Sequence, residues 1–254
     1  TGYTVSNYTH FTYIAAKASG NACSGYNGVA QLNGAHQFIP DPRSKIVIVH
    51  EFGHNLGLYH ASRDLNGNGK IEASVSEVYG DHSCIMGNDF SGAIPHINAS
   101  NTLKLGLLDT HNSPIQDVSQ NGVYHLSPLA DVKNPDDPKV IKILGLSKNY
   151  QLAYRAKVGE DSDLKNSFVG LNLYEGKVFQ NGSSYGDTGS LDHKAITAVS
   201  ESFTDSTGGL KLTLLSSNAK FAEVKIEFLG GGSGGGGGPN PTLPPPPPSC
   251  VRNP

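Results

Sequence analysis

The feature that most constrains the fold of this chain is the string from His50 to His60, which reads H-E-F-G-H-N-L-G-L-Y-H. His50 and His54 are four residues apart, so on an α-helix they lie one turn apart on the same face, and both imidazoles can reach one metal ion. Gly57 can adopt the left-handed backbone conformation that ends a helix and turns the chain, which would bring His60 back as a third ligand. The string therefore predicts a helix that carries a metal site.

The residue types in this string indicate which metal and which chemistry to expect. Three neutral imidazole nitrogens suit Zn²⁺ and leave a fourth position open for water, which is the pattern of a catalytic zinc site. Glu51 lies beside the first histidine and can reach a metal-activated water without being a ligand, so we expect it to act as a general base. The alternative is an ordinary helix with polar histidines at its rim, or a motif that holds no metal. A third histidine and a glycine at these spacings argue against both alternatives.

The neighbouring residues predict the bounds of this helix. Asp41 can cap a helix and Pro42 fits the first helical position, so we expect the helix to run from there to near Gly57. Residues at helical spacing follow at Ile46, Val49, Phe52 or Gly53, and Leu56. Before it, short strands and loops are expected, with residues 11–16 as the clearest strand. After it we expect a long loop over residues 59–95 and a second helix over residues 98–108.

Beyond His111 the pattern changes to short apolar runs, several of them alternating, with turn residues between them. Such runs predict an antiparallel β-sandwich. The strand candidates are residues 140–144, 150–154, 168–174, 210–214 and 221–228. From Gly230 to Pro254, glycine and proline make up 16 of 25 residues, which is typical of a flexible linker to a further module.

The single methionine of the chain, Met86, follows 26 residues after His60 in the run Tyr79-Gly-Asp-His-Ser-Cys-Ile-Met-Gly87. A lone methionine most simply fills core space. A methionine in a tight turn after the long histidine motif is instead typical of the metzincin peptidases. We therefore interpret residues 79–87 as a Met-turn. Asp81 within it either orients a ligand imidazole or is a turn residue.

With these two segments the chain resembles the metzincin clan of zinc peptidases, and within it the gametolysin-like metallopeptidases. Weaker similarity is found at residues 105–108, 150–155, 159–161 and 203–205. The resemblance implies that His50, His54 and His60 bind zinc, that Glu51 is the general base and that Met86 packs beneath the ligands. It also implies a secreted endopeptidase that hydrolyses extended peptide substrates, such as extracellular-matrix or cell-wall proteins.

This resemblance completes the predicted architecture, which is α+β. We expect a metzincin-like zinc peptidase domain over residues 1–112, an antiparallel β domain over 113–229 and a linker over 230–254. Only 49 residues precede His50, so we expect the first strands and a helix of the catalytic domain to be missing. The substrate is expected to pair with an edge strand within residues 28–38.

The chain departs from the family pattern at Asn88. Some metzincins place a tyrosine there, two residues after the methionine, as an additional ligand. Help in stabilising the transition state must then come from elsewhere, and Tyr79 and His82 are the candidates. Neither residue has a spacing that singles it out, so both stay open at this point.

The loop after His60 resembles the first half of an EF-hand calcium loop, with oxygen side chains two residues apart followed by a glycine. These residues are Asp64, Asn66, Asn68 and Gly69. Val75 stands where the bidentate glutamate is expected, and Glu72 or Glu77 could substitute for it. The alternative is a polar turn rich in asparagine and glycine, so calcium is a second candidate cofactor beside zinc.

Composition and cysteine content bear on partners and compartment. A net charge of −3 without a basic block excludes the usual footprint of a nucleic-acid binder, and no apolar run approaches the length of a membrane span. Cys23 and Cys84 either form a disulfide, which fits a secreted protein, or are two buried thiols. Cys250 follows the linker and is expected to belong to a further module.

Two other functions compete with the peptidase. The first is a non-catalytic binding or adhesion module with a structural zinc site, for which a glutamate at position 51 would have no use. The second makes the β domain a carbohydrate-binding or matrix-binding unit that positions the peptidase. The aromatic residues Tyr154, Tyr174, Phe179 and Tyr185 would allow this second role, although such residues are more often part of a core.

Overall fold

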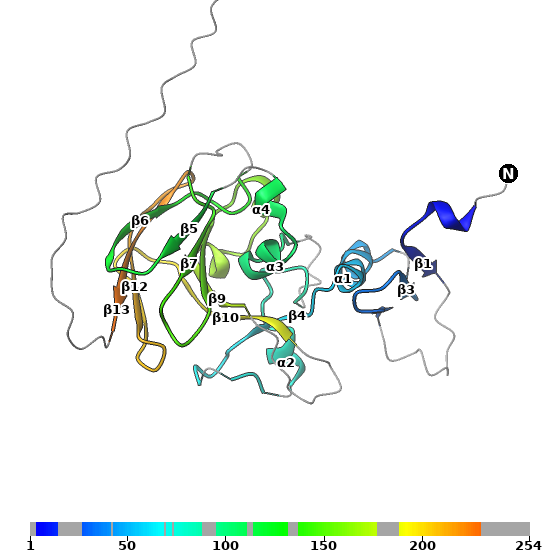
Figure 1. The fold of residues 1–254 in the computed structure, drawn as a ribbon, viewed down its shortest axis with the longest axis horizontal. Coiled ribbons are helices and arrows are strands. Elements are labelled where there is room, and N and C mark those ends of the chain that lie inside the picture. Colours follow the sequence, from blue (N-terminus) through cyan, green and yellow to red (C-terminus); the bar gives the residue numbers. More distant parts are fainter. Residues whose placement is uncertain are drawn as a thin grey trace, which may run out of the picture.

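The structure is a computed structural model that describes residues 4–14, 27–41, 43–68, 70–72, 74–87, 95–110, 114–131, 137–176 and 188–229. Within these residues the fold is α+β, with three sheets and a few short helices (Figure 1). The predicted linker over residues 230–254 lies outside the described residues, as do Cys23, Asn88 and Cys250.

The N-terminal part forms a small sheet beside the helix that carries the histidines. Its strands are β1 (Phe11–Ile14), β2 (Val29–Ala30) and β3 (His36–Ile39), and their order is β1-β3-β2, so β2 is an edge strand. β1 runs parallel to β3, and β2 runs antiparallel to it. A 3₁₀ turn, η1 (Val5–Asn7), precedes them. In Figure 1, helix α1 (Lys45–Asn55) lies between this sheet and the rest of the molecule.

Helix α1 differs from its prediction at its start and in the direction of its faces. Ser44 is the N-cap, with its hydroxyl accepting a hydrogen bond from Val47 N at 3.4 Å, whereas Asp41 pairs with Arg43 instead. The buried face carries the residues Val47, His50, Glu51, Gly53 and Asn55. The apolar residues Val49, Phe52 and Leu56, which periodicity predicts to face the core, are exposed. The metal-site residues occupy the buried face. Of the periodic positions, Gly53 is buried and Ile46 packs against a small core, so the periodicity identified this face only in part.

The C-terminal end of α1 agrees with the prediction. Gly57 has φ +87°, a left-handed conformation that side chains with a Cβ rarely adopt. Its N–H donates to His54 O at 2.9 Å, and the next N–H, of Leu58, donates to Gly53 O at 2.9 Å. These two bonds form a Schellman motif, which ends the helix and turns the chain towards His60.

The rest of the chain builds two larger sheets. The six-stranded sheet has the order β4-β10-β9-β8-β7-β5. Its strands are β4 (His60–Arg63), β5 (Ile115–Val118), β7 (Val140–Ile143), β8 (Tyr150–Arg155), β9 (Gly170–Glu175) and β10 (Thr188–Ile196). The four-stranded sheet has the order β11-β12-β13-β6. Its strands are β6 (Gly122–Leu126), β11 (Ser202–Asp205), β12 (Leu210–Ser217) and β13 (Ala222–Phe228). All five strand candidates of this part are thereby confirmed to within a few residues.

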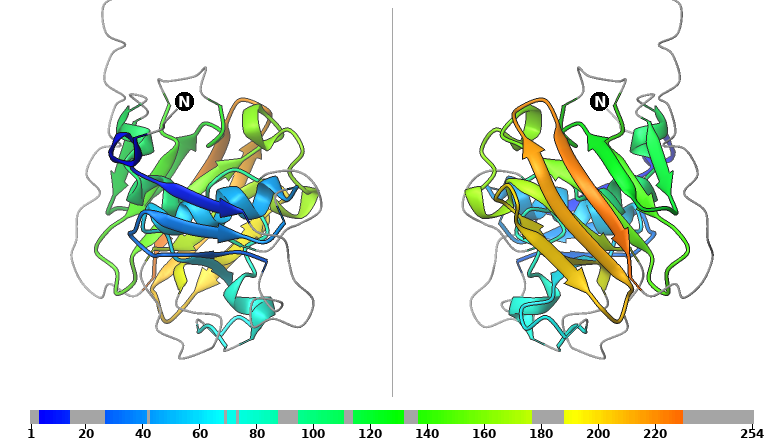
Figure 2. Two further views of the ribbon diagram at one scale, coloured as in Figure 1. Left: turned by 90° about the vertical axis from the view of Figure 1, so that its right-hand side faces the viewer. Right: turned by 90° about the vertical axis from the view of Figure 1, so that its left-hand side faces the viewer.

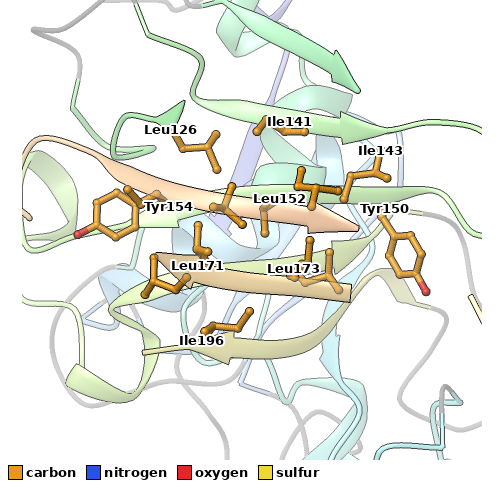
Figure 3. Close-up of a cluster of buried hydrophobic side chains, with 14 of the residues drawn as sticks. Leu126, Ile141, Ile143, Tyr150, Leu152, Tyr154, Leu171, Leu173 and Ile196 are labelled. Atoms are coloured by element: carbon orange, nitrogen blue, oxygen red, sulfur yellow. The ribbon is translucent and has the colours of Figure 1, made fainter. Parts of the chain in front are cut away.

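One hydrophobic core joins the two larger sheets. It includes Leu152, Leu171 and Ile196 from the six-stranded sheet, and Leu212 and Val224 from the four-stranded sheet. Figure 3 shows side chains of this core, and in the right-hand view of Figure 2 the orange strands of the smaller sheet lie in front. Burial of such apolar area is the main driving force of folding.

The expectation of a purely antiparallel β part is wrong at both edges of the six-stranded sheet. β4 runs parallel to β10, and β5 runs parallel to β7. Parallel pairs need long connections, and here β5 reaches β7 by way of β6 in the other sheet. β4, which begins with His60, comes from before the expected boundary at residue 112 and is hydrogen-bonded into the sheet beyond it.

The segments between α1 and β5 also differ in part from their predictions. Residues 59–95 are not one loop, because they include β4 and the short helix α2 (Val75–Val78). The second predicted helix is divided into α3 (Ala99–Lys104) and α4 (Leu107–Thr110), since Gly106 has φ +64°. Asn98 caps α3, as its side chain accepts from Asn101 N. Two 3₁₀ turns, η3 (Gly159–Asp161) and η4 (Asn166–Phe168), precede β9.

A half-buried ion pair in this part makes stability depend on pH. Burial alone would raise the pKa of Asp205, but hydrogen bonds from Lys148, Tyr150 and Gly208 lower it to about 2. Lys148 Nζ lies 2.6 Å from the carboxylate, and Gly208 N lies 2.7 Å from it. Because the folded pKa lies below the ordinary value of 3.8, this stabilisation is complete above about pH 4 and is lost as the pH falls towards 2.

We therefore expect Asp205→Asn to lower the free energy of unfolding by about 2 kcal/mol at pH 7, in the range for hydrogen bonds to a charged group. The deficit relative to the wild type should shrink as the pH falls from 4 towards 2. Urea unfolding of both proteins across this range measures it. A deficit that stays constant with pH would contradict the assignment of this charge as the stabilising group.

Candidate metal centre

Three histidines converge at the end of α1 and the start of β4. The possible ligand atoms of His50, His54 and His60 all lie within 4.8 Å of one another. In the described part of the chain this is the one cluster of three or more histidine, cysteine or acidic side chains with such a spacing. The ligand set expected from the sequence is therefore brought together by the fold, with Gly57 making the turn between its second and third members.

The hydrogen bonds of the first two histidines leave one nitrogen of each ring available to a metal. His50 Nδ1 lies 2.8 Å from Ile85 O, and His54 Nδ1 lies 2.7 Å from Leu58 O. A carbonyl oxygen can only accept, so both Nδ1 atoms carry the proton and both Nε2 atoms have a free lone pair. Carbonyl partners of this kind also fix the orientation of ligand imidazoles.

The same two imidazoles are neutral at physiological pH. Burial, followed by the proximity of His54, lowers the pKa of His50 to about 4. Burial also lowers the pKa of His54, and its bond to Leu58 O only partly offsets this effect. Neutral imidazole is the form that binds a divalent metal, so metal binding here does not have to displace a proton at pH 7.

The third histidine is enclosed by aromatic rings. The His60 ring centroid lies 4.0 Å from that of Tyr79 and 4.8 Å from that of His54. Tyr79 also stacks on His50, with ring centroids 6.0 Å apart. Of the two candidates left open by the sequence, Tyr79 thus lies against the histidines, whereas His82 is outside the cluster.

Met86 lies directly beneath the helix that carries the first two histidines. It is fully buried, and a Cβ added at Gly53 would come within 2.4 Å of its sulfur atom. Its carbonyl accepts a hydrogen bond from Ala61 N at 2.9 Å, next to His60. Leu58, Ala61, Cys84 and Ile85 complete this small core. Met86 thus packs against α1 at Gly53, and its role as the floor of a Met-turn stays a prediction.

This packing predicts how the site responds to changes at Met86. We expect Met86→Ala to lower the free energy of unfolding by about 2 kcal/mol, because it leaves a cavity beneath Gly53. Met86→Leu, which conserves volume, should cost less than about 1.5 kcal/mol. Chemical denaturation of the metal-free proteins measures both values. Equal losses for the two variants would contradict a cavity as the cause.

Glu51 lies on the buried face of α1 and is next to the edge strand β2. Burial raises the pKa of its carboxyl to about 7. A Cβ added at Gly28, the residue before β2, would lie 2.6 Å from Glu51 Oε1 and 2.7 Å from a methyl group of Val47. Glycine thus allows the backbone of residue 28 to approach the carboxylate closely. The segment expected to bind substrate and the expected general base are neighbours.

Asp81 is a turn residue, and its carboxylate accepts hydrogen bonds from Ser83 and Asn98 and not from a ligand imidazole. One carboxylate oxygen accepts from Ser83 N at 3.0 Å and from the Ser83 hydroxyl at 2.5 Å. The other accepts from Asn98 Nδ2 at 2.8 Å. Of the two roles left open for Asp81, the hydrogen bonds favour the turn. The carbonyls of Ile85 and Leu58 orient the imidazoles instead, and sequence reasoning missed them because a backbone carbonyl has no sequence signature.

The candidate calcium loop is closed by its own hydrogen bonds. Asp64 Oδ1 accepts from Gly67 N at 2.7 Å, and Asn66 Oδ1 accepts from Asn68 N at 3.0 Å. Asn68 Oδ1 accepts from Lys70 N at 2.8 Å. Gly69 lies outside the described residues. These bonds fit a polar turn, and calcium binding stays a prediction, for which a Ca²⁺-dependent rise in melting temperature is the measurement.

The remaining sequence predictions about this region concern cysteine and the membrane. Cys84 is buried and forms no disulfide with another described residue. Burial, together with the nearby Asp81, raises the pKa of its thiol to about 12, which makes the thiol form unreactive at neutral pH. Its pairing with Cys23 stays a prediction, because Cys23 is outside the described residues. Within those residues no helix is long and apolar enough to cross a membrane.

No protein-family model, no curated protein and no solved structure matches this chain. The main features of the site are three converging imidazoles, a buried glutamate beside an edge strand and a methionine beneath the helix.

Proposed function

We propose that this chain is a secreted, zinc-dependent endopeptidase of the metzincin, gametolysin-like kind. The observation that carries the proposal is the convergence of three imidazoles next to Glu51. Two of these imidazoles donate from Nδ1 to a backbone carbonyl, which leaves their Nε2 atoms available to a metal. Three neutral nitrogen donors are the ligand set of a catalytic zinc site. A zinc ion held by His50, His54 and His60 would supply Lewis acidity towards the scissile carbonyl and an activated water.

Within this proposal Glu51 moves the proton. Its carboxylate is adjacent to the ligands in sequence without being one of them, and so can accept a proton from the attacking water. It then returns that proton to the leaving amine as the peptide bond breaks. Tyr79, whose ring lies against His60 and His50, is the residue that we propose to contact the reacting carbonyl. Asn88 lies outside the described residues, so the departure from the family pattern at that position stays as the sequence shows it.

The proposed substrate is an extended peptide bound along β2. This strand is an edge of its sheet, and Gly28, the residue before it, approaches the Glu51 carboxylate. An added strand would gain backbone hydrogen bonds from β2, with side chains alternately facing the protein. The exposed side chains of Val29 and Leu32 on this segment suit apolar side chains of the substrate. Extracellular-matrix or cell-wall proteins are the proposed natural substrates.

In this proposal the β part of the chain has a structural role. Two sheets around one core are the arrangement of a β-sandwich. Two of its four candidate carbohydrate-binding aromatics, Tyr154 and Tyr174, are buried. Phe179 and Tyr185 lie outside the described residues. A carbohydrate-binding role therefore has less support than it had from the sequence.

The proposal predicts metal dependence. We expect the purified protein to bind one zinc ion, to cleave an unfolded protein such as casein, and to lose cleavage in a chelator such as 1,10-phenanthroline. His54→Ala should lose zinc, whereas His125→Ala should keep both zinc and activity, since His125 is exposed and pairs with Glu223. Metal analysis and a mass-spectrometric cleavage profile measure both. Cleavage that persists in excess chelator would contradict the proposal, and zinc binding without cleavage would favour the non-catalytic module.

A further inference from the structure

One buried side chain connects the β part of the molecule to the turn beneath the candidate metal site. Arg155, the last residue of β8, is fully buried. Its Nε and Nη2 each lie 2.6 Å from an oxygen of Asp161, which forms a bidentate ion pair. The same guanidinium donates to Ser83, from Nη2 to the carbonyl at 3.0 Å and from Nη1 to the hydroxyl at 3.3 Å.

Ser83 belongs to the segment that orients the metal-site residues. Two residues further along, Ile85 O accepts a hydrogen bond from His50 Nδ1 at 2.8 Å. The Met86 carbonyl then binds Ala61 N, and Asp81 N donates to Ala61 O at 3.2 Å. Residues 81–87 therefore hold the orientation of His50 on one side and the strand that begins at His60 on the other.

The strand that carries His60 is bound to the β part by a second route. β4 pairs with β10, with Ala61 opposite Ser190. Asn98 joins the two routes, since its Nδ2 donates to Asp81 Oδ2 and to Ser190 Oγ, at 2.8 Å each. A fully buried polar network of this kind stays in place only when its members are mutually satisfied.

From these contacts we infer that Arg155 is a positioning residue of the metal centre. Held in orientation by Asp161, its guanidinium fixes the turn at Ser83 and so keeps the Ile85 carbonyl in register with His50. The β part is then a component of the metal site and not an appended binding module. The inference rests on the proposed function in one respect, namely that the three histidines bind zinc.

The competing role for a buried arginine–aspartate pair is purely structural, and the chain offers a matched control for it. Lys148 and Asp205 form an ion pair in the same part of the molecule, and their bonds go to Tyr150 and Gly208 and not to the turn. Loss of that pair should destabilise the β part and leave the metal site intact. Loss of Arg155 should affect both.

The experiment compares Arg155→Met, Arg155→Lys, Ser83→Ala and Asp205→Asn with the wild type. It measures zinc affinity by chelator competition, the visible spectrum of the Co²⁺-substituted protein and the melting temperature of the metal-free form. We expect both Arg155 variants to bind zinc about 10-fold to 100-fold more weakly, as for other residues that orient ligands, and to change the Co²⁺ spectrum. Lysine should not rescue, because it lacks the planar fork that serves Asp161 and Ser83 together.

The other two variants, Ser83→Ala and Asp205→Asn, keep the test decisive. Ser83→Ala retains the ion pair between Arg155 and Asp161, so it stays informative if Arg155→Met does not fold; we expect it to weaken zinc binding about 10-fold. Asp205→Asn should lower the melting temperature without changing zinc affinity or the Co²⁺ spectrum. Wild-type zinc affinity and an unchanged spectrum in Ser83→Ala and the folded Arg155 variants would overturn the inference alone. A wild type that binds no zinc would overturn it together with the proposed function.

Discussion

Glu51→Gln is expected to abolish peptide hydrolysis while zinc remains bound. The amide keeps the size of the side chain and its place on the buried face of α1, next to Gly28. It cannot accept the proton of the attacking water, and removal of a general base typically costs about 10²-fold to 10⁴-fold in rate. The three histidines are unchanged, so one equivalent of zinc should still be found.

Steady-state cleavage of a fluorogenic peptide and metal analysis of the same sample measure this. Glu227→Gln is the matched control, because Glu227 lies on β13 of the four-stranded sheet and pairs with Lys211 and Lys225; its turnover should equal that of the wild type. If Glu51→Gln changed only KM and left kcat at the wild-type value, this carboxylate would not be the general base. Loss of zinc from the variant would instead make Glu51 part of the structure of the site.

Gly87→Ala should disrupt the turn beneath the metal site. A Cβ at this position would lie 2.0 Å from Asp81 O and 3.1 Å from Tyr79 O, which are both backbone atoms that cannot move independently. We expect a loss of about 3 kcal/mol or more in the free energy of unfolding, at the upper end for overpacking. Displacement of the turn should also weaken zinc binding, since Ile85 O orients His50.

The control for this substitution is Gly145→Ala. Gly145 has φ +82°, and a Cβ there would meet nothing within 4 Å, so the variant carries backbone strain without a clash. We expect it to cost about 1 kcal/mol, the usual penalty of the left-handed conformation, with zinc affinity unchanged. Urea unfolding and chelator competition measure both proteins. Equal destabilisation of the two variants would show that the contact at Gly87 is relieved at no cost.

The predictions that succeeded depend on short-range geometry, and those that failed depend on what packs where. The alternating run of β13 and the left-handed turn at Gly57 were found because their signals lie within a few residues. β10 was missed because its buried side chains include Ser190 and Asp192, so it has no apolar alternation. The buried face of α1 was misjudged for a similar reason, since His50 and Glu51 are polar and buried.

The spacing of the histidines is enough to identify the candidate ligands, because a four-residue interval on a helix and a glycine turn act over a few residues. What holds those ligands in place depends on tertiary packing. The carbonyl that orients His50 belongs to Ile85, 35 residues away, and Arg155 reaches Ser83 across 72 residues. The strand that begins at His60 pairs with β10, which begins at Thr188. Backbone acceptors and strand edges look alike in every sequence, so such partners are defined only when packing brings them together.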